Sequence, residues 1–433
     1  MRKRLKNVCL RIFNKAYKAD VDDNIMIRTK CLVCNSTELE QIIDLGSHPF
    51  ADTFVPESRF GEADNIYPLV CDLCMQCGHV QTRYETSPDA RYSQVDYSYT
   101  SSNSNFSRKH WEDYAREVSG AIGIKNDSFV VEIGSNDGYL SEQFIKNGHR
   151  AIGVDPSPYV AELAKKRGVE TIVGLFGKAP AEKIIAKYGK ADLVIANNVF
   201  NHADNPVEFT RAVADTLKND GSFVFEQPYW LIGVESGKFD QIYHEHVSYF
   251  TVKSVAALLD RAGMVITSAQ VVDYHGGSLR VIAQKKEQAH ETCEEAKKMI
   301  AKEEARGLFE IETYKNFMQR NLLQRSRFLQ KVHHIKEEGG AIIAVGAAAK
   351  GNTFLNFYKL DRTIIDYVTD SSPHKKGKYT PATRIPIVGD EIFSKYGKVY
   401  ALILSWNIAP QLKEILSNFN KNIEFISPEE AKI

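Results

Sequence analysis

The chain has 433 residues, more than one hydrophobic core usually holds, so we expect two to four domains. Basic and acidic residues are balanced at 55 each, which argues against bulk binding of nucleic acid. No apolar run approaches the roughly 18 residues of a membrane span, and the basic start lacks the apolar segment of a secretory signal. We therefore expect a globular cytoplasmic protein without a transmembrane segment.

Residues 1–28 form a basic extension in which Leu5, Val8, Ile12 and Phe13 follow helical spacing. The pattern predicts either a short helix that packs on the rest of the protein or a frayed tail. Peripheral contact with an anionic membrane is the alternative.

The next segment, residues 29–105, contains two Cys-x-x-Cys pairs. We take it as a zinc-binding domain with a tyrosine-rich loop. Such pairs can present four thiolates tetrahedrally to zinc, and each needs a tight turn that Asn35 or Gly78 can supply. With no histidine or carboxylate in the cluster, we expect a structural metal in a reducing compartment. A second pair made by Cys71 with Cys74 is the alternative. The predicted ligands are Cys31, Cys34, Cys74 and Cys77.

Tyrosine and serine are unusually frequent between about 84 and 110, in the stretch YSQVDYSYTSSNSNFSRKHW. This density of hydroxyl groups is typical of a loop. Because the stretch directly precedes the central domain, it could cover the cleft of that domain, and a polar linker is the alternative.

Strands and helices alternate in the central domain, which we place at residues 106–285. The alternation predicts a parallel, doubly wound sheet with strands at 129–133, 151–155, 170–173, 191–197 and 221–227. Two further strands, 265–272 and 278–284, are separated by only five residues, too few for a crossover helix, so they must pair antiparallel. An α/β sheet that ends in an antiparallel hairpin is the pattern of class I methyltransferases.

The first strand of this domain runs into a glycine-containing loop, FVVEIGSNDGYL, at the edge of the sheet where ligands bind. Its carboxylates disfavour a pyrophosphate but suit a ligand with a positive centre and a ribose, such as S-adenosylmethionine. Asp155, at the end of the next strand, can take ribose hydroxyls, although it could instead cap a helix. Our candidates for holding S-adenosylmethionine are Glu132, Gly134, Asn136 and Asp155.

Residues 286–433 read as a helical connection, to about 338, followed by a second, Rossmann-like α/β domain with strands at 341–345, 364–368 and 401–404. Small residues after its first strand let a ligand approach the backbone, and a basic turn follows near Lys378. This half therefore looks suited to a phosphorylated ligand. A packing glycine and a solvated run of lysines are the alternative.

The stretch QIYHEHVSYF, after the fifth parallel strand, places three titratable groups in a row at the ligand-binding edge. A histidine with a pKa near 7 is the natural base at neutral pH. The spacing alone is compatible with catalysis, with metal binding by His-x-His, and with structural hydrogen bonds.

Six motifs stand out along the chain: the cysteine pairs with CGHVQ, the loop VEIGSNDG, and the stretches ANNVFNHADN, YHEHVSYF, HGGSLRV and GAAAKGNTFLN. In this order they resemble the three-domain, zinc-containing sugar C-methyltransferases, which use S-adenosylmethionine to methylate C3 of nucleotide-linked 4-keto-deoxysugars. The resemblance covers about residues 29–433. It departs at Thr380–Ile387, TPATRIPI, where the family usually has Pro-Gly-Thr and this chain has Ala382, which puts the local turn and its contact with the sugar nucleotide in doubt.

The resemblance implies that a base removes the proton that a 4-keto group acidifies on C3, and that the enolate carbon then attacks the methyl group. It implies that His246 is this base, with Tyr243 and Glu245 in support. A tyrosine of the preceding loop, Tyr97 or else Tyr99, also belongs to the family's site.

Further candidates come from these motifs and, for Lys378, from the basic turn of the C-terminal domain. Asn198 and His202 could polarise the ketone or hold the enolate oxygen. Candidates for the sugar nucleotide are Lys350, Asn352, Lys378 and Arg280. The family's members are often monomers.

Three other functions are compatible with parts of the sequence. Methylation of oxygen or nitrogen on a sugar or another small molecule needs no acidic C–H bond. A zinc-knuckle protein that binds or methylates RNA conflicts with the neutral charge, and a non-catalytic scaffold conflicts with the intact HEH box.

Overall fold

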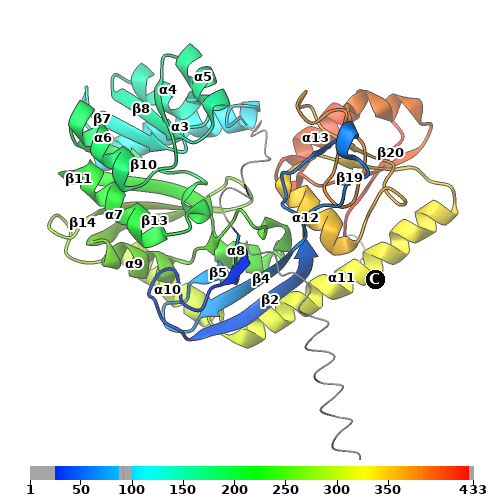
Figure 1. The fold of residues 1–433 in the computed structure, drawn as a ribbon, viewed down its shortest axis with the longest axis horizontal. Coiled ribbons are helices and arrows are strands. Elements are labelled where there is room, and N and C mark those ends of the chain that lie inside the picture. The colour runs from blue at the N-terminus through cyan, green and yellow to red at the C-terminus, as the bar shows by residue number, and fades with distance from the viewer. Residues whose placement is uncertain (1–24, 87–90, 92–99, 429–433) are drawn as a thin grey trace, which may run out of the picture.

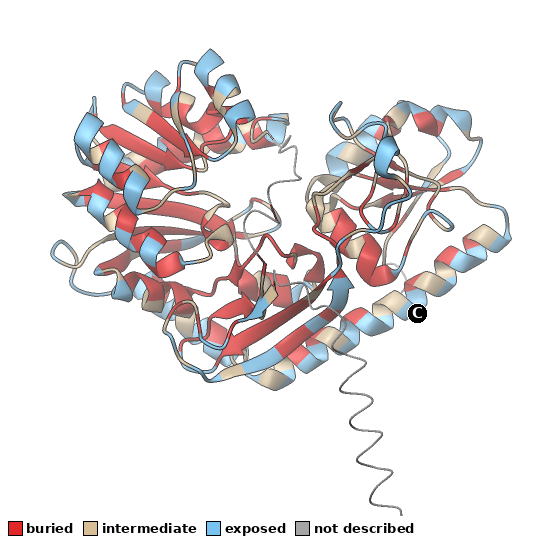
Figure 2. Ribbon diagram, viewed as in Figure 1, coloured by how far each residue is buried: buried red, intermediate tan, exposed pale blue. Residues whose placement is uncertain are grey.

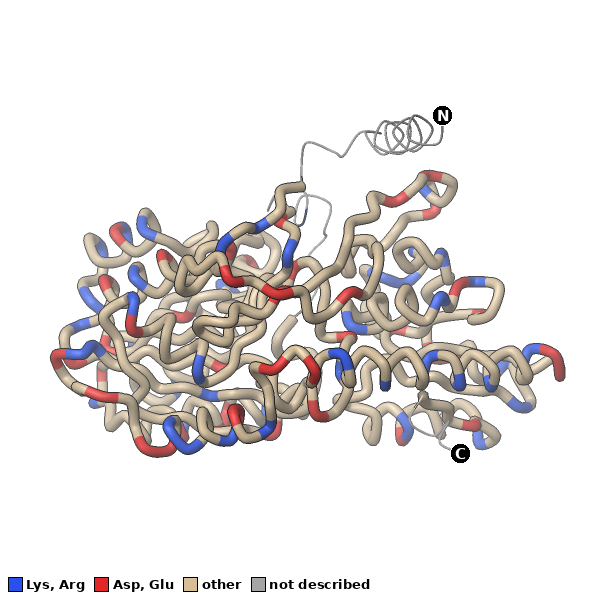
Figure 3. Tube along the Cα trace, turned by 90° about the horizontal axis from the view of Figure 1, so that it is seen from below, with Lys and Arg blue, Asp and Glu red and all other residues tan. Residues whose placement is uncertain are grey.

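The computed structural model describes residues 25–86, 91 and 100–428 (Figure 1). The basic extension before residue 25 and the predicted site residue Tyr97 lie outside these residues. Among the described helices, none combines the length and the apolar character that crossing a membrane requires. Lys and Arg are interspersed with Asp and Glu along the described chain (Figure 3).

The central domain is built on a seven-stranded sheet in the order β13-β14-β11-β10-β7-β8-β9. Five of these strands pair parallel to one another: β7 (Phe129–Ile133), β8 (Arg150–Asp155), β9 (Glu170–Val173), β10 (Ala191–Ile195) and β11 (Leu217–Pro228). The hairpin of β13 (Met264–Val272) and β14 (Ser278–Lys285) is antiparallel and pairs with β11 through β14. The predicted class I methyltransferase fold, with its terminal hairpin, is confirmed.

Alternate residues of the strands enter cores on opposite faces of this sheet. Val130 packs in one core with α3 (Asn105–Ile122) and α4 (Tyr139–Lys146). Its neighbour Val131 packs in the other with α6 (Lys178–Tyr188), α7 (Pro206–Thr216) and α9 (Val252–Arg261). Helix α5 (Pro158–Lys166) follows β8, and α8 (Trp230–Glu235) follows β11. The sheet is buried on both sides (Figure 2), which explains its continuous apolar strands.

The zinc-binding segment forms a four-stranded antiparallel sheet in the order β12-β5-β4-β2. Its strands are β2 (Leu39–His48), β4 (Tyr67–Cys74), β5 (Val80–Thr82) and β12 (Ser248–Tyr249). The last of these comes from the YHEHVSYF box of the central domain, so the box completes the sheet of another domain. A separate pair joins β1 (Ile25–Ile27) to β6 (Tyr84–Thr86).

The C-terminal domain holds a parallel five-stranded sheet in the order β18-β16-β15-β19-β20. The connection to it is helical, α10 (Glu294–Ala305) and the long α11 (Ile311–Glu337), which runs beneath the molecule in Figure 1. The remaining elements are β15 (Ile342–Val345), α12 (Ala349–Tyr358), β16 (Tyr367–Thr369), β18 (Ile387–Val388), β19 (Val399–Ile403), α13 (Ala409–Leu416) and β20 (Ile423–Ile426).

The strand expected at 364–368 begins later than predicted, at Tyr367. The amides of Ile364 and Ile365 donate to the carbonyl of Asp361, at 3.1 and 2.9 Å, and this turn consumes the first apolar residues of the run. An apolar run alone does not distinguish a strand from the turn that leads into it.

A short pair of β3 (Val55–Pro56) and β17 (Lys378–Tyr379) joins the zinc-binding and C-terminal domains. Beside it, Ala382 adopts a φ of 57°, the left-handed region that glycine takes without steric cost. The amide of Ala382 donates to the Asp64 carboxylate at 2.6 Å, and Arg384 forms an ion pair with the same group. The turn thus adopts a glycine-like backbone despite the alanine, held by the opposite domain.

Candidate active site and zinc site

The sulfur atoms of four cysteines lie within 4.8 Å of one another: those of Cys31, Cys34, Cys74 and Cys77. The Cys31–Cys77 and Cys34–Cys74 sulfur distances are 3.6 and 3.5 Å. Four thiolates at about 2.3 Å from a tetrahedral zinc lie about 3.8 Å apart, so this cluster fits the ion. All four positions are taken by sulfur, as in a structural site.

The turns of the two cysteine pairs are those the sequence predicted. Asn35 and Gly78 have φ values of 63° and 70°. A Cβ on Gly78 would also lie 2.4 Å from the Phe309 ring, so only glycine fits there. Cys71 lies in β4, opposite Thr82, and is not part of the four-sulfur cluster.

The glycine-containing loop after β7 has the backbone that a closely approaching ligand requires. Gly134 has a φ of 67°, and a Cβ there would lie 2.1 Å from the Val199 side chain. The Asn136 amide donates to the Asp155 carboxylate at 2.9 Å, so the loop and the end of β8 meet at the sheet edge as expected. Burial raises the pKa of Asp155.

Glu132 points below this loop, toward the start of α4. Its carboxylate accepts from the amide of Ser141 at 2.9 Å and from the Ser141 hydroxyl at 2.5 Å. Burial raises the pKa of Glu132 to about 8. Glu132 therefore holds the start of α4 beneath the loop, whereas Asp155 lies at the sheet edge, where it contacts the loop itself.

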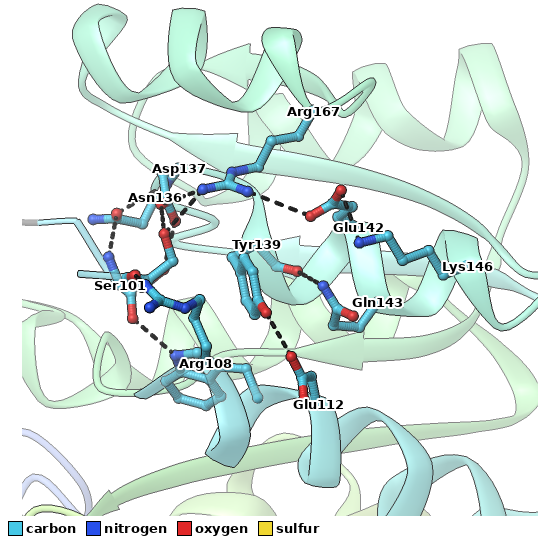
Figure 4. A network of polar contacts seen from close by, with 12 residues as sticks. Ser101, Arg108, Glu112, Asn136, Asp137, Tyr139, Glu142, Gln143, Lys146 and Arg167 are labelled. Atoms are coloured by element: carbon cyan, nitrogen blue, oxygen red, sulfur yellow. Dashed lines mark hydrogen bonds and ion pairs between the residues drawn. The ribbon is translucent and has the colours of Figure 1, made fainter. Parts of the chain in front are cut away.

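The end of the tyrosine- and serine-rich stretch lies on the same loop (Figure 4). The Ser101 amide donates to the Asn136 side chain at 2.9 Å, and the Ser101 hydroxyl donates to Asp137 at 2.7 Å. The Ser102 hydroxyl also donates to Asp137, and Arg167 pairs with this carboxylate at 3.3 Å. The described part of the stretch therefore covers the loop, and sequence reasoning missed Asp137 as its anchor.

His246 is buried and held at both ring nitrogens. Nδ1 lies 2.9 Å from the carbonyl of Gln241, so it carries the proton and donates. Nε2 is therefore the acceptor, and the Tyr243 hydroxyl donates to it at 2.5 Å. Burial, followed by the neighbouring His202, lowers the pKa of His246 well below 6.5. The imidazole is thus neutral, with its basic nitrogen fixed in direction.

The sheet edge supplies polar groups around this imidazole. The His202 ring meets the His246 ring edge-on, with centroids 4.9 Å apart, and burial lowers the pKa of His202 to about 4. Asn198, four residues before it, has a φ of 54°, and its amide donates to the Glu226 carbonyl. Asn198 and His202 therefore lie on the same turn after β10, as predicted.

The other two residues of the HEH box differ in their surroundings. His244 packs against the rings of Phe50 and Tyr67 in the zinc-binding domain. Glu245 is buried, neither carboxylate oxygen has a hydrogen-bond partner among the described residues, and burial raises its pKa to about 7. Metal binding by His-x-His is not supported by the structure, because neither His244 nor His246 belongs to the four-cysteine cluster, the only such group among the described residues.

The C-terminal domain brings Lys350 toward the same site. Burial lowers the pKa of Lys350, and its charge in turn lowers the pKa of His246. Its Nζ lies 5.0 Å from the centroid of the Trp406 ring, and the Trp406 indole donates to Asp240 at 2.6 Å. Trp406 and Asp240 are site-forming residues that the sequence offered no motif to find.

The other candidates for the sugar nucleotide occupy different places. The side-chain Nδ2 of Asn352 donates to the carbonyl of Ala51 at 2.6 Å, linking α12 to the zinc-binding domain, and Lys378 lies in β17. Arg280 lies apart on β14, where its guanidinium pairs with Glu226 at 2.5 Å and Glu117 at 2.7 Å. Because these carboxylates already occupy it, we leave Arg280 out of the proposed nucleotide site.

Replacing Gly134 with alanine should weaken S-adenosylmethionine binding at least tenfold. The new Cβ would displace Val199 and hold a left-handed φ, which together cost about 2–4 kcal/mol. Isothermal titration calorimetry measures the affinity. Gly148, also at positive φ but with open space around it, is the matched control, and an unchanged affinity in Gly134→Ala would contradict this placement of the ligand.

Three family models match the chain in succession: a zinc binding domain over residues 31–92, a methyltransferase domain over 106–269, and a C-methyltransferase C-terminal domain over 273–428. The C-methyltransferase NovU of Streptomyces niveus is 31% identical over 393 residues, 90% of this chain and 93% of NovU. A ubiquinone biosynthesis O-methyltransferase of Methylobacterium sp. (strain 4-46) is 26% identical over 34% of this chain and 63% of its own length.

Among solved structures, magnesium protoporphyrin IX methyltransferase from Synechocystis PCC 6803 matches 41% of this chain and 83% of its own, at 14% identity and a TM-score of 0.34, too low to carry an argument. The domain matches and the similarity to NovU along nearly the whole chain agree with the observed fold and the four-cysteine cluster. This chain is an S-adenosylmethionine-dependent methyltransferase with a structural zinc site, and it belongs to the zinc-containing sugar C-methyltransferase family.

Proposed function

We propose that this enzyme methylates C3 of a nucleotide-linked 4-keto-deoxysugar. The observation that carries the proposal is the buried, neutral His246, whose Nδ1 proton is fixed by the Gln241 carbonyl and whose Nε2 lone pair is directed at the Tyr243 hydroxyl. A neutral imidazole with an oriented lone pair is what removal of a C–H proton beside a ketone requires.

In this proposal S-adenosylmethionine, held by Gly134, Asn136 and Asp155 above a loop supported by Glu132, supplies an electrophilic methyl group. His246 takes the C3 proton on Nε2, either directly where the Tyr243 hydroxyl now lies or through that hydroxyl. His202, which its lowered pKa keeps neutral, retains one ring N–H that can donate a hydrogen bond to the enolate oxygen, and Asn198 lies on the same turn.

The remaining groups serve binding. Lys350 would attract the diphosphate, and we keep Asn352 and Lys378, at other places in the C-terminal domain, as weaker candidates for the nucleotide. Glu245, buried without a hydrogen-bond partner among the described residues, is available to a sugar hydroxyl. We place Tyr97, which lies outside the described residues, at the same site by its motif.

We propose that the enzyme is a monomer, as the members of this family often are. We also propose that the enzyme is located in the cytoplasm, because a reducing compartment keeps the zinc-binding thiols reduced. Size-exclusion chromatography with light scattering tests the monomer, and a dimer at assay concentration would contradict it.

A panel of nucleotide-linked 4-keto sugars incubated with S-adenosylmethionine tests the function, with the products read by mass. In D₂O without the methyl donor, the true substrate should exchange its C3 hydrogen for deuterium. Methylation without any C3 exchange would favour the main alternative, transfer to an oxygen or nitrogen. The partial similarity to ubiquinone biosynthesis O-methyltransferases keeps that alternative in the panel.

A further inference from the structure

The segment that carries His246 is clamped to the zinc-binding domain by main-chain bonds. Strand β12 begins two residues after His246 and pairs antiparallel with β5, Ser248 opposite Gln81 and Tyr249 opposite Val80. The Thr82 amide donates to the carbonyl of Val247 at 2.9 Å, which brings the ladder to the residue next to His246.

Two side chains connect this ladder to the zinc-binding cysteines. His79 follows Cys77 and Gly78 directly, is fully buried, and its Nε2 lies 3.1 Å from the Ser248 hydroxyl. Its carbonyl accepts from the amide of Cys74 at 2.8 Å. His79 therefore joins the second cysteine pair to β12.

Gln81 joins the first cysteine pair to β5. Its Oε1 accepts from the amide of Leu32, inside the pair, at 2.8 Å, and its Nε2 donates to the carbonyl of Lys30 at 3.1 Å. The Gln81 side chain is fully buried, and both its donor and acceptor are used on this one segment. A displacement of the first cysteine pair would thus displace β5 and, through the ladder, β12. His79 couples the second pair to β12 directly.

The opposite side of the box is anchored in the central domain. The Val247 amide donates to the carbonyl of Asn201 at 2.9 Å, next to His202, and the His246 amide donates to the carbonyl of Tyr243 at 2.9 Å. The box therefore lies between two supports, one from the central sheet and one from the zinc-binding sheet.

We propose that His79 and Gln81 are positioning residues, which transmit the geometry of the zinc-bound cysteine pairs to His246. The inference rests on the proposed function, since it takes His246 as the base. The zinc site would then set the position of the catalytic imidazole as well as stabilise its own domain. Loss of such supporting hydrogen bonds typically costs about 10–100-fold in activity, and a misplacement of about 1 Å can cost about 100-fold.

Gln81→Leu tests this directly, because leucine retains the bulk but removes both contacts to the first pair. We expect one zinc per chain, unchanged affinity for S-adenosylmethionine, and C3 deuterium exchange slowed 10–100-fold. Gln81→Glu, which keeps an acceptor for the Leu32 amide, should recover part of the rate. Gln76→Leu is the matched control, an exposed glutamine within the second cysteine pair, and should behave as wild type.

Amide hydrogen–deuterium exchange supplies a readout that needs no substrate. In Gln81→Leu, but not in Gln76→Leu, the amides of the β5–β12 ladder, including that of Thr82, should lose protection while those of β7 and β8 keep theirs. If Gln81→Leu does not fold, Ser248→Ala removes the His79 contact from the other side and should give the same two effects.

Wild-type C3 exchange in Gln81→Leu and Ser248→Ala, or full protection of the β5–β12 ladder amides in both variants, would overturn the inference. Failure of the proposed function has a different signature: the wild-type enzyme itself would catalyse no C3 exchange. The amide measurements would then still decide whether the zinc site orders the box.

Discussion

Replacing His246 with asparagine or alanine should reduce methyl transfer by about 10²–10⁴-fold, the usual contribution of a general base. Both replacements remove Nε2, the nitrogen that faces the Tyr243 hydroxyl. Affinity for S-adenosylmethionine should stay within twofold, because the hydrogen bonds that hold the donor's loop after β7 come from Asp155 and from Glu132 with Ser141. Product mass measures transfer and calorimetry measures affinity. His334→Asn, on the exposed face of α11, is the control for loss of a histidine.

The same residue predicts the pH dependence. Burial lowers the pKa of His246 well below 6.5, and the base acts only when it is deprotonated. In Glu245→Gln, which removes the carboxyl whose pKa burial raises to about 7, the rate of C3 exchange should therefore stay constant from neutral pH to below 6.5, and fall only as the pH passes the lowered pKa of His246. An acid limb at or above pH 6.5, or wild-type turnover in His246→Asn, would remove His246 as the base.

The central sheet was predictable because its signals are local. Buried parallel strands appear as continuous apolar runs, and a five-residue connection forces β13 and β14 to pair antiparallel. The run before Tyr367 shows the limit, since Ile364 and Ile365 are apolar yet belong to a turn formed by Asp361. Two hydrogen bonds to the Asp361 carbonyl set that boundary, and a pattern of apolar residues carries no information about them.

The HEH box was recognisable by its motif, but its surroundings were not. The pairing of β12 with β5 joins segments from two domains, and no periodicity within either segment announces it. The same holds for Trp406 and Asp240, which meet Lys350 from separate parts of the chain. Contacts between domains depend on the orientation of whole sheets, so they had to come from the structure.

Arg280 shows the opposite limitation. Its motif, HGGSLRV, made it a candidate for the sugar nucleotide, because a guanidinium is a common partner of phosphate. In the fold it faces Glu226 and Glu117, and its guanidinium lies 4.8 Å from the Tyr114 ring. A charge read from sequence carries no information on which countercharge the fold will bring to it.

Cys74→Ser should lose the zinc and most of the soluble protein, and Cys31→Ser should do the same. Binding of a structural zinc contributes about 10–16 kcal/mol in small zinc-binding peptides, comparable with the whole stability of a domain, about 5–15 kcal/mol. The four ligands come from two separate segments, one before β2 and one at and after the end of β4, so the ion would cross-link these two segments of the domain. Elemental analysis of the soluble fraction measures zinc per chain, and thermal denaturation measures the stability.

Variants of two other cysteines test whether zinc is lost because a ligand is removed or because a buried thiol is replaced. Cys71→Ser places a hydroxyl in the buried strand β4 and should lower the stability slightly while zinc stays at one per chain, because Cys71 is outside the four-sulfur cluster. Cys293→Ser, partly exposed at the start of α10, should change neither. Full zinc in both Cys31→Ser and Cys74→Ser would refute the ligand set. Zinc lost in Cys71→Ser but kept in Cys77→Ser would instead select Cys71 with Cys74 as the second pair, and β4 would then have to unpair from β5 to bring the Cys71 sulfur to the metal.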